Sequence, residues 1–227
     1  MNLRLTKILS ILAVALVLGW VGAISAQAEV IDFAGGTGGT VSYATTGGDL
    51  TGTGIPISSV EGSFVPLNNL VTLNSPDAVL SFTTGALTGT TASTWSFGAG
   101  GAGSITIKGD LYNGPDIPAN LVATGTLLSG AINSALASAI PGTGFKLIVS
   151  HFKDAKNEAL LDFYGAIGPF VGLMAITVND SSVLPPGTFT GTPVSTDVSN
   201  VPLPSSMLLL SSGLVGLLAL GQRIRKR

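Results

Sequence analysis

The chain has 227 residues, enough for one ordinary domain, and it contains no cysteine and a single histidine. This composition excludes disulfide bonds and thiolate metal sites, and it argues against histidine-based catalysis. The formal net charge of −2 is far from the basic balance of a nucleic-acid-binding protein, so no nucleic-acid partner is expected.

The charged residues divide the chain into an acidic middle and two basic ends. All 12 acidic residues lie between Glu29 and Asn200, where only four of the 10 basic residues are found. The middle therefore carries a net charge of −8, and the other six basic residues give the ends +6. An acidic body between basic, apolar ends is typical of an exported protein whose ends interact with membranes.

The first 28 residues have the three parts of a secretory signal peptide. Residues 1–7 carry two basic side chains, residues 8–24 are apolar, and Ala26 and Ala28 are the small residues of a cleavage site. The sequence predicts that the export translocon delivers a mature chain beginning at Glu29. The alternative interpretation is a retained N-terminal membrane anchor.

Residues 29–182 contain short apolar groups separated by Gly, Asn, Asp or Pro, which indicates a folded, β-rich exported domain. Alternation is strictest at 104–108, which predicts a half-buried strand ending at a turn formed by Gly109 and Asp110. Further strands are expected at 30–33, 40–44, 55–60, 78–83, 95–97, 121–128, 145–152, 159–164, 172–178 and 188–194. About eleven strands suggest a sandwich or barrel, and we expect an antiparallel β-sandwich or jelly-roll-like body.

Two segments of the body allow a helix. Residues 130–140 lie before a Pro-Gly pair and predict the one helix of the body. The charged run 153–158 is expected to be a hairpin loop between two strands. Its alternative is the start of a helix through Tyr164, which would place three carboxylates on one face: Asp154, Glu158 and Asp162.

The C-terminal part of the chain begins with residues 183–200, which combine three prolines with Ser, Thr and Gly. This composition predicts one last strand followed by a flexible tether.

The last 27 residues contain a Pro motif, an apolar stretch at 205–221 and a basic cluster, in that order. Seventeen residues of helix are about 25 Å long, near the lower limit for spanning a bilayer. The basic cluster stays cytoplasmic by the positive-inside rule, so the sequence predicts a single-pass transmembrane helix with the body outside. A permanent single-span anchor is the simplest alternative. The motif is Val201, Pro202, Leu203 and Pro204, and the basic stop is Arg223, Arg225, Lys226 and Arg227.

This tripartite tail resembles the PEP-CTERM sorting signal of exported bacterial proteins, with Leu203 in place of the usual acidic residue between the two prolines. The resemblance implies that an exosortase, a membrane-embedded Cys-dependent transpeptidase, cuts the chain near the motif. It also implies a bacterium that has an outer membrane and makes extracellular polysaccharide. The same tail module occurs on some proteins labelled ice-binding.

These features together predict an exported, non-enzymatic protein. It would be anchored in the inner membrane before processing and located at the cell surface or in the extracellular matrix afterwards. Association with exopolysaccharide or biofilm is a hypothesis at this stage. The alternative is a β-sandwich binding module for carbohydrate, calcium or ice.

Two sequence patterns resemble catalytic or cofactor-binding motifs. The letters G-x-G-x-x-G at 98–103 precede a strand pattern and not the helix of a dinucleotide site, so we expect a β-turn there. His151 lies in an apolar strand pattern whose neighbour Ser150 points to the other face, so we expect a structural or surface histidine. The sequence predicts no catalytic residue and no cofactor.

Two further patterns concern binding. Asp110 and Asp116 flank one loop, and other carboxylates cluster within 154–162, but neither stretch has the spacing of a calcium loop. We expect solvated loops there and no metal site. Thr-Gly-Thr recurs at irregular intervals, which ordinary β-propensity explains, at 51–53, 88–90, 124–126 and 190–192.

Overall fold

The computed structural model describes residues 31–64, 69–98, 103–166, 168, 170–179 and 185–202. These ranges contain thirteen strands. The strands are Ile31–Gly35 (β1), Thr40–Tyr43 (β2), Asp49–Pro56 (β3), Ser59–Phe64 (β4), Asn69–Asn74 (β5), Val79–Thr90 (β6), Thr94–Gly98 (β7), Ser104–Tyr112 (β8), Leu121–Ala131 (β9), Ser134–Ile140 (β10), Gly144–Lys156 (β11), Phe170–Asn179 (β12) and Phe189–Pro202 (β13).

Two short helices accompany the strands, the α-helix Glu158–Tyr164 (α2) and the 3-10 helix Pro118–Asn120. Within the described ranges, no helix has the length and apolar character that a bilayer crossing needs. The predicted signal peptide with Ala26 and Ala28 lies outside these ranges, as do the predicted transmembrane helix and the basic stop.

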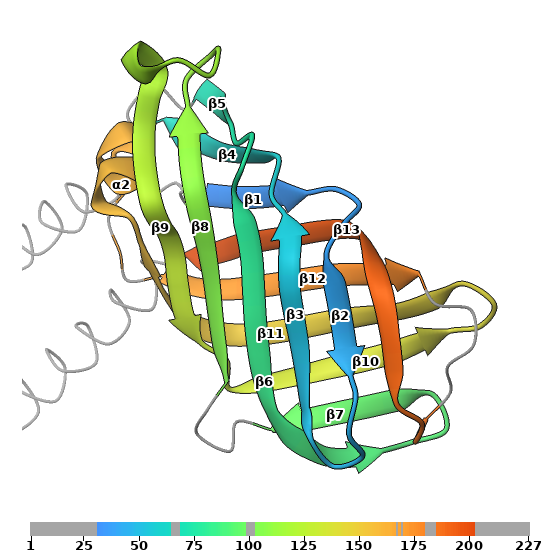
Figure 1. Cartoon of the computed structure of the whole chain (residues 1–227). Helices are drawn as coiled ribbons and strands as arrows, with labels where there is room; N and C mark the ends of the chain where they lie inside the picture. The colour runs from blue at the N-terminus through green and yellow to red at the C-terminus, as the bar shows by residue number, and fades with distance from the viewer. Residues whose placement is uncertain are drawn as a thin grey trace, which may run out of the picture. The chain divides into compact units, whose positions relative to one another are not determined.

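All thirteen strands pair antiparallel in one sheet that closes on itself in a ring. The order is β1-β4-β5-β8-β9-β11-β10-β7-β6-β3-β2-β13-β12, and β1–β13, β8–β6 and β11–β12 pair in addition. Figure 1 shows β9, β8, β6, β3 and β2 crossing in front of β1, β12, β11, β10 and β7. The prediction of a mainly β, antiparallel body is confirmed.

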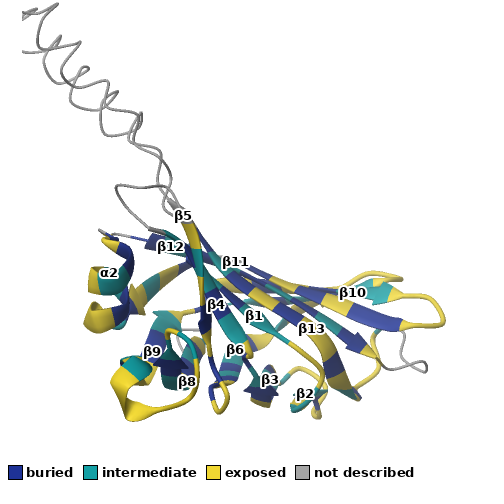
Figure 2. Cartoon of the chain, turned by 90° about the horizontal axis from the view of Figure 1, so that it is seen from above, coloured by how far each residue is buried: buried dark blue, intermediate teal, exposed yellow. Residues whose placement is uncertain are grey.

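The core of the body lies on the inner face of the ring. Buried and partly exposed residues alternate along the whole of β12, and Figure 2 shows the same alternation on its neighbours. Aromatic side chains fill one part of this core, where the Phe189 ring lies 4.2 Å from Phe145 and 5.0 Å from Trp95, centroid to centroid. Burying each large apolar side chain stabilises the fold by about 1.5–3 kcal/mol.

The predicted helix at 130–140 is wrong, because this stretch forms the end of β9 and all of β10. Ala135 and Ala137 are buried, whereas Leu136 between them is 40% exposed. Small side chains therefore carry the inward positions of β10, and the strand is held by pairing with both β7 and β11. Alanine favours helices locally, and here the tertiary pairing overrides that preference.

The predicted hairpin at 153–158 is also wrong, and the helical alternative holds only from Glu158 onward. β11 continues to Lys156, and α2 replaces the strand expected at 159–164. The Asn157 side chain accepts a hydrogen bond from the Ala159 N–H as the N-cap, and Gly165 ends the helix with φ 72°. Because Asp154 lies in β11, it does not share a helix face with Glu158 and Asp162.

Three other boundaries differ from the sequence prediction. β8 continues through Gly109 and Asp110, because β9 pairs with both residues and leaves no turn there. The strand expected at 55–60 is two strands, since β3 ends at Pro56 and β4 begins at Ser59. β13 extends through the stretch predicted as a tether, where it pairs with β12 and β1.

Candidate functional site

The first half of the predicted sorting motif lies in the last strand of the body. Val201 and Pro202 are the final residues of β13, and their backbones pair with Val171 and Phe170 of β12. Leu203 and Pro204 lie outside the described residues. The paired sheet therefore extends into the motif without an intervening loop.

The two ends of the body meet in neighbouring strands. β1 pairs with β13 from Asp32 opposite Ser199 to Gly35 opposite Thr196. At the end of this pairing, the Ile31 N–H donates a hydrogen bond of 2.6 Å to Oδ1 of Asn200. Asn200 is 2% exposed, so this contact is shielded from water. A polar side chain is thus fixed inside the body, one residue before the motif.

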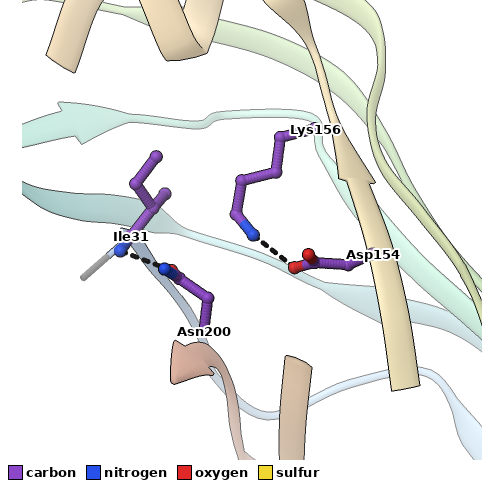
Figure 3. Close-up of polar contacts among 4 residues, drawn as sticks. All are labelled: Ile31, Asp154, Lys156 and Asn200. Carbon is purple, nitrogen blue, oxygen red and sulfur yellow. Dashed lines mark hydrogen bonds and ion pairs between the residues drawn. The ribbon is translucent and has the colours of Figure 1, made fainter. Parts of the chain in front are cut away.

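A buried ion pair faces the same part of the core as Asn200 (Figure 3). Asp154 and Lys156 point inward from the end of β11, form an ion pair, and have side chains that are each 1% exposed. The Lys156 Nζ also lies 4.5 Å from the centroid of the Phe170 ring, a cation–π contact. Figure 3 shows the lysine amine between the Asp154 carboxylate and the Asn200 amide.

The surroundings shift the pKa of Lys156 and leave one oxygen of Asp154 without a hydrogen-bond partner among the described residues. Burial lowers the pKa of the Lys156 ammonium from its ordinary value, although the Asp154 carboxylate raises that pKa in the opposite direction. Oδ1 of Asp154 is buried and has no hydrogen-bond partner among the described residues. The sequence did not reveal this cluster, because its members come from three strands and Asp154 and Lys156 read as part of a solvated loop.

A separate cluster, formed by three carboxylates, lies on the outer face of β1, β4 and β13. Asp32 pairs across strands with Glu61, and Asp197 lies opposite Ala34, the next outward residue of β1. Burial raises the pKa of Asp32 from 3.8 to about 6, and the charges of Asp197 and Glu61 add to this effect. Among the described residues, no group of three acidic or histidine side chains is arranged to hold a metal ion.

A row of hydroxyl side chains crosses the outer face of five neighbouring strands. The β-pairing places one hydroxyl residue of each strand side by side: Thr190, Ser42, Thr51, Thr83 and Ser104, in the order β13, β2, β3, β6 and β8. Oγ of Ser42 and Oγ1 of Thr190 are 2.9 Å apart, a hydrogen bond within the row. Two of the four Thr-Gly-Thr segments, 51–53 and 190–192, contribute to this row. The other three members are polar positions of predicted strands, and their alignment across strands had no signal in the sequence.

The remaining sequence candidates are not brought into a common site. β8 begins one residue after the glycine-rich run 98–103, so no helix follows that run. His151 lies in β11 at an irregularity of register between Ser150 and Phe152. Asp110 accepts hydrogen bonds from Thr124 Oγ1 at 2.5 Å and from the Tyr112 hydroxyl at 3.4 Å.

A shallow hollow of about 190 Å³ lies beside the turn after β10, with Ile140, Thr143, Val178 and Val194 among its lining residues. It lacks a charged lining residue and is too small to enclose a typical ligand. No protein-family model, curated protein or solved structure matches this chain.

Proposed function

We propose that the chain is an exported, non-enzymatic surface protein whose tail is removed by an exosortase near residues 201–204. The single observation that carries this proposal is the order of the parts in the tail, with the paired strand β13 reaching into the motif. β13 ends at Pro202, and the apolar stretch and the basic stop follow it in the sequence. Cutting after Pro202 would separate the tail from the body without removing any described strand.

The position of the motif is compatible with cleavage by a membrane enzyme. Proline has no backbone N–H and cannot donate to a sheet, so Pro202 is a natural place for pairing to stop. The finer architecture that we propose for the body is sandwich-like, with the crossing strands of Figure 1 as its two layers.

Processing is tested by comparing tail variants in cells that contain or lack the exosortase. We expect Pro204→Ala to accumulate as the unprocessed form and Leu203→Glu, which restores the acidic residue of the signal, to be processed at least as fast as the wild type. Pro118→Ala, at an exposed site outside the motif, is the matched control. Equal processing of all variants, or processing without the exosortase, would contradict the proposal.

A second candidate function is binding of a neutral polysaccharide by the hydroxyl row. Its five members are exposed or half-buried, and none carries a charge. Hydroxyl groups in a fixed array can donate to and accept from sugar hydroxyls, and a row that crosses five strands offers an extended line of such groups to a glycan. Thr51→Val with Thr83→Val should abolish retention in a neutral polysaccharide gel, whereas Thr143→Val in the turn after β10 should not. A wild type that shows no retention would exclude this function.

A further inference from the structure

Three functional groups with complementary reactivity gather inside the body. An amine from β11, a carboxylate from the same strand and a carboxamide from β13 meet near the end of the ring, as Lys156, Asp154 and Asn200. The amine and carboxylate side chains are each 1% exposed, and Asn200 is 2% exposed. Water is therefore excluded from all three groups at once.

Burial shifts Lys156 toward the neutral amine. It disfavours the charged form of a lysine, and the Phe170 ring, whose centroid is 4.5 Å from Nζ, adds apolar surface. Asp154 is in direct contact with the amine and can accept its proton. An uncharged amine that has lost its hydration is a nucleophile, as in lysines that attack carbonyl groups in enzymes.

The carbonyl group of Asn200 is held as an electrophile. The Ile31 N–H donates to Oδ1 at 2.6 Å, and a backbone donor in this position stabilises the negative charge that develops when a nucleophile adds to the carbon. β13 and β1 fix this geometry through their pairing, so little movement is needed at the moment of reaction.

We propose that Lys156 and Asn200 join in an intramolecular isopeptide bond, with Asp154 as the proton carrier. Lys156 transfers one proton to Asp154, and its Nζ lone pair attacks Cγ of Asn200. A new Nζ–Cγ bond forms, and the Cγ–Nδ2 bond breaks after a proton moves from Nζ to Nδ2. Ammonia leaves and takes up the proton held by Asp154, so the net products are one amide and one ammonium ion.

This bond would fasten the last strand of the body to β11 immediately before the sorting motif. Residues 156–200 would become a covalently closed loop that contains α2, β12 and most of β13. A pull on the tail, from a membrane or from a polymer joined to the processed end, would then act on a covalent bond and not on strand pairing. The proposal does not depend on which enzyme processes the tail.

Peptide mapping of the full-length wild-type protein tests the proposal. We expect trypsin to leave the chain uncut after Lys156, and we expect chymotryptic digestion to give a branched peptide that contains Lys156 and Asn200. The mass of that branched peptide should be lower than the sum of its two parts by one ammonia. A free Lys156 amine together with an intact or merely deamidated Asn200, found in the folded protein, would overturn the proposal.

Single variants distinguish loss of the isopeptide bond from loss of the fold. Lys156→Met and Asn200→Ala remove the two joined groups and should each abolish the branched peptide, whereas Lys153→Met, on the outward face of the same strand, should retain it. Asp154→Asn should form the bond far more slowly while circular dichroism shows a folded sheet. If a variant does not fold, the peptide map of the wild-type protein still shows whether the isopeptide bond forms. A branched peptide that forms equally fast in Asp154→Asn would overturn the role of Asp154.

Discussion

Asp32, Glu61 and Asp197 gather negative charge on the strands that join the two ends of the body. Oδ1 of Asp32 is buried and has no hydrogen-bond partner among the described residues. Burial and the neighbouring carboxylates raise the pKa of Asp32 to about 6 in the folded protein. The folded state therefore holds a proton that the unfolded chain releases at lower pH, and this residue makes stability depend on pH.

The free energy of unfolding should fall as pH rises from 3.8 to about 6, since the folded protein binds the Asp32 proton more tightly than the unfolded chain across that interval. Asp32→Asn should flatten this part of the profile and raise stability at neutral pH. Urea unfolding at a series of pH values measures both effects. Asp162→Asn, at an exposed site of α2, is the control and should keep the wild-type slope. A profile that is unchanged by Asp32→Asn would refute the assignment.

Gly62 packs closely against the buried ring of Tyr164, which leaves no room for a larger residue. A Cβ atom on Gly62 would lie 2.7 Å from the nearest carbon of the Tyr164 ring. That ring is buried, and its hydroxyl donates to the carbonyl groups of Val60 and Val71 at 3.1 and 3.0 Å, so it has little freedom to move. Gly62→Ala should cost about 1–3 kcal/mol of unfolding free energy, as overpacked cores do.

Gly89→Ala is the matched control for this measurement, because a Cβ at Gly89 meets no atom within 4 Å. Chemical denaturation of the two variants compares them directly. A loss of stability that is equal at both positions would show that the cost comes from the strand backbone and not from the tyrosine.

At the scale of elements, one asparagine joins α2 to the sheet. The Asn157 side chain caps the helix through the Ala159 N–H, and its amide donates to the carbonyl groups of Thr124 and Thr126 in β9 at 3.2 Å each. Asn157→Ala removes all three contacts and should destabilise the protein by about 1–2 kcal/mol. Asn157→Ser keeps a side-chain oxygen for the cap and loses the two amide donors, so its cost should be smaller. Thermal unfolding of the two variants compares these costs, and a serine variant as unstable as the alanine variant would contradict the capping role.

Elements with large apolar side chains at their buried positions were the predictable ones. Residues 104–108 alternate large apolar with polar side chains, residues 172–178 form an apolar run with Thr177 as its polar member, and both lie in strands. β10 was missed because its buried positions are alanines, whose small side chains give a weak hydrophobic signal. α2 was predicted only as the alternative to a strand, because a seven-residue helix contains too few turns to show a 3.6-residue period clearly.

At the scale of the whole body, closure of the sheet brings together residues that no local pattern relates. The buried cluster takes Lys156 from β11 and Asn200 from β13, and the β1–β13 pairing supplies the Ile31 N–H. The register of such distant strands depends on the packing of the complete core, which alternation within one strand does not encode. The tail motif could be read from the sequence, whereas the hydroxyl row and the buried cluster required the pairing of strands.

We expect the folded, exported body to be released from its tail. Intact-mass analysis of the native protein, from membrane and medium fractions of its own cells, determines both ends of the mature chain. The expected species, in the medium or on the cell surface, begins at Glu29 and ends within 201–204. A protein found only in the membrane fraction, with its C-terminus still at Arg227, would contradict it.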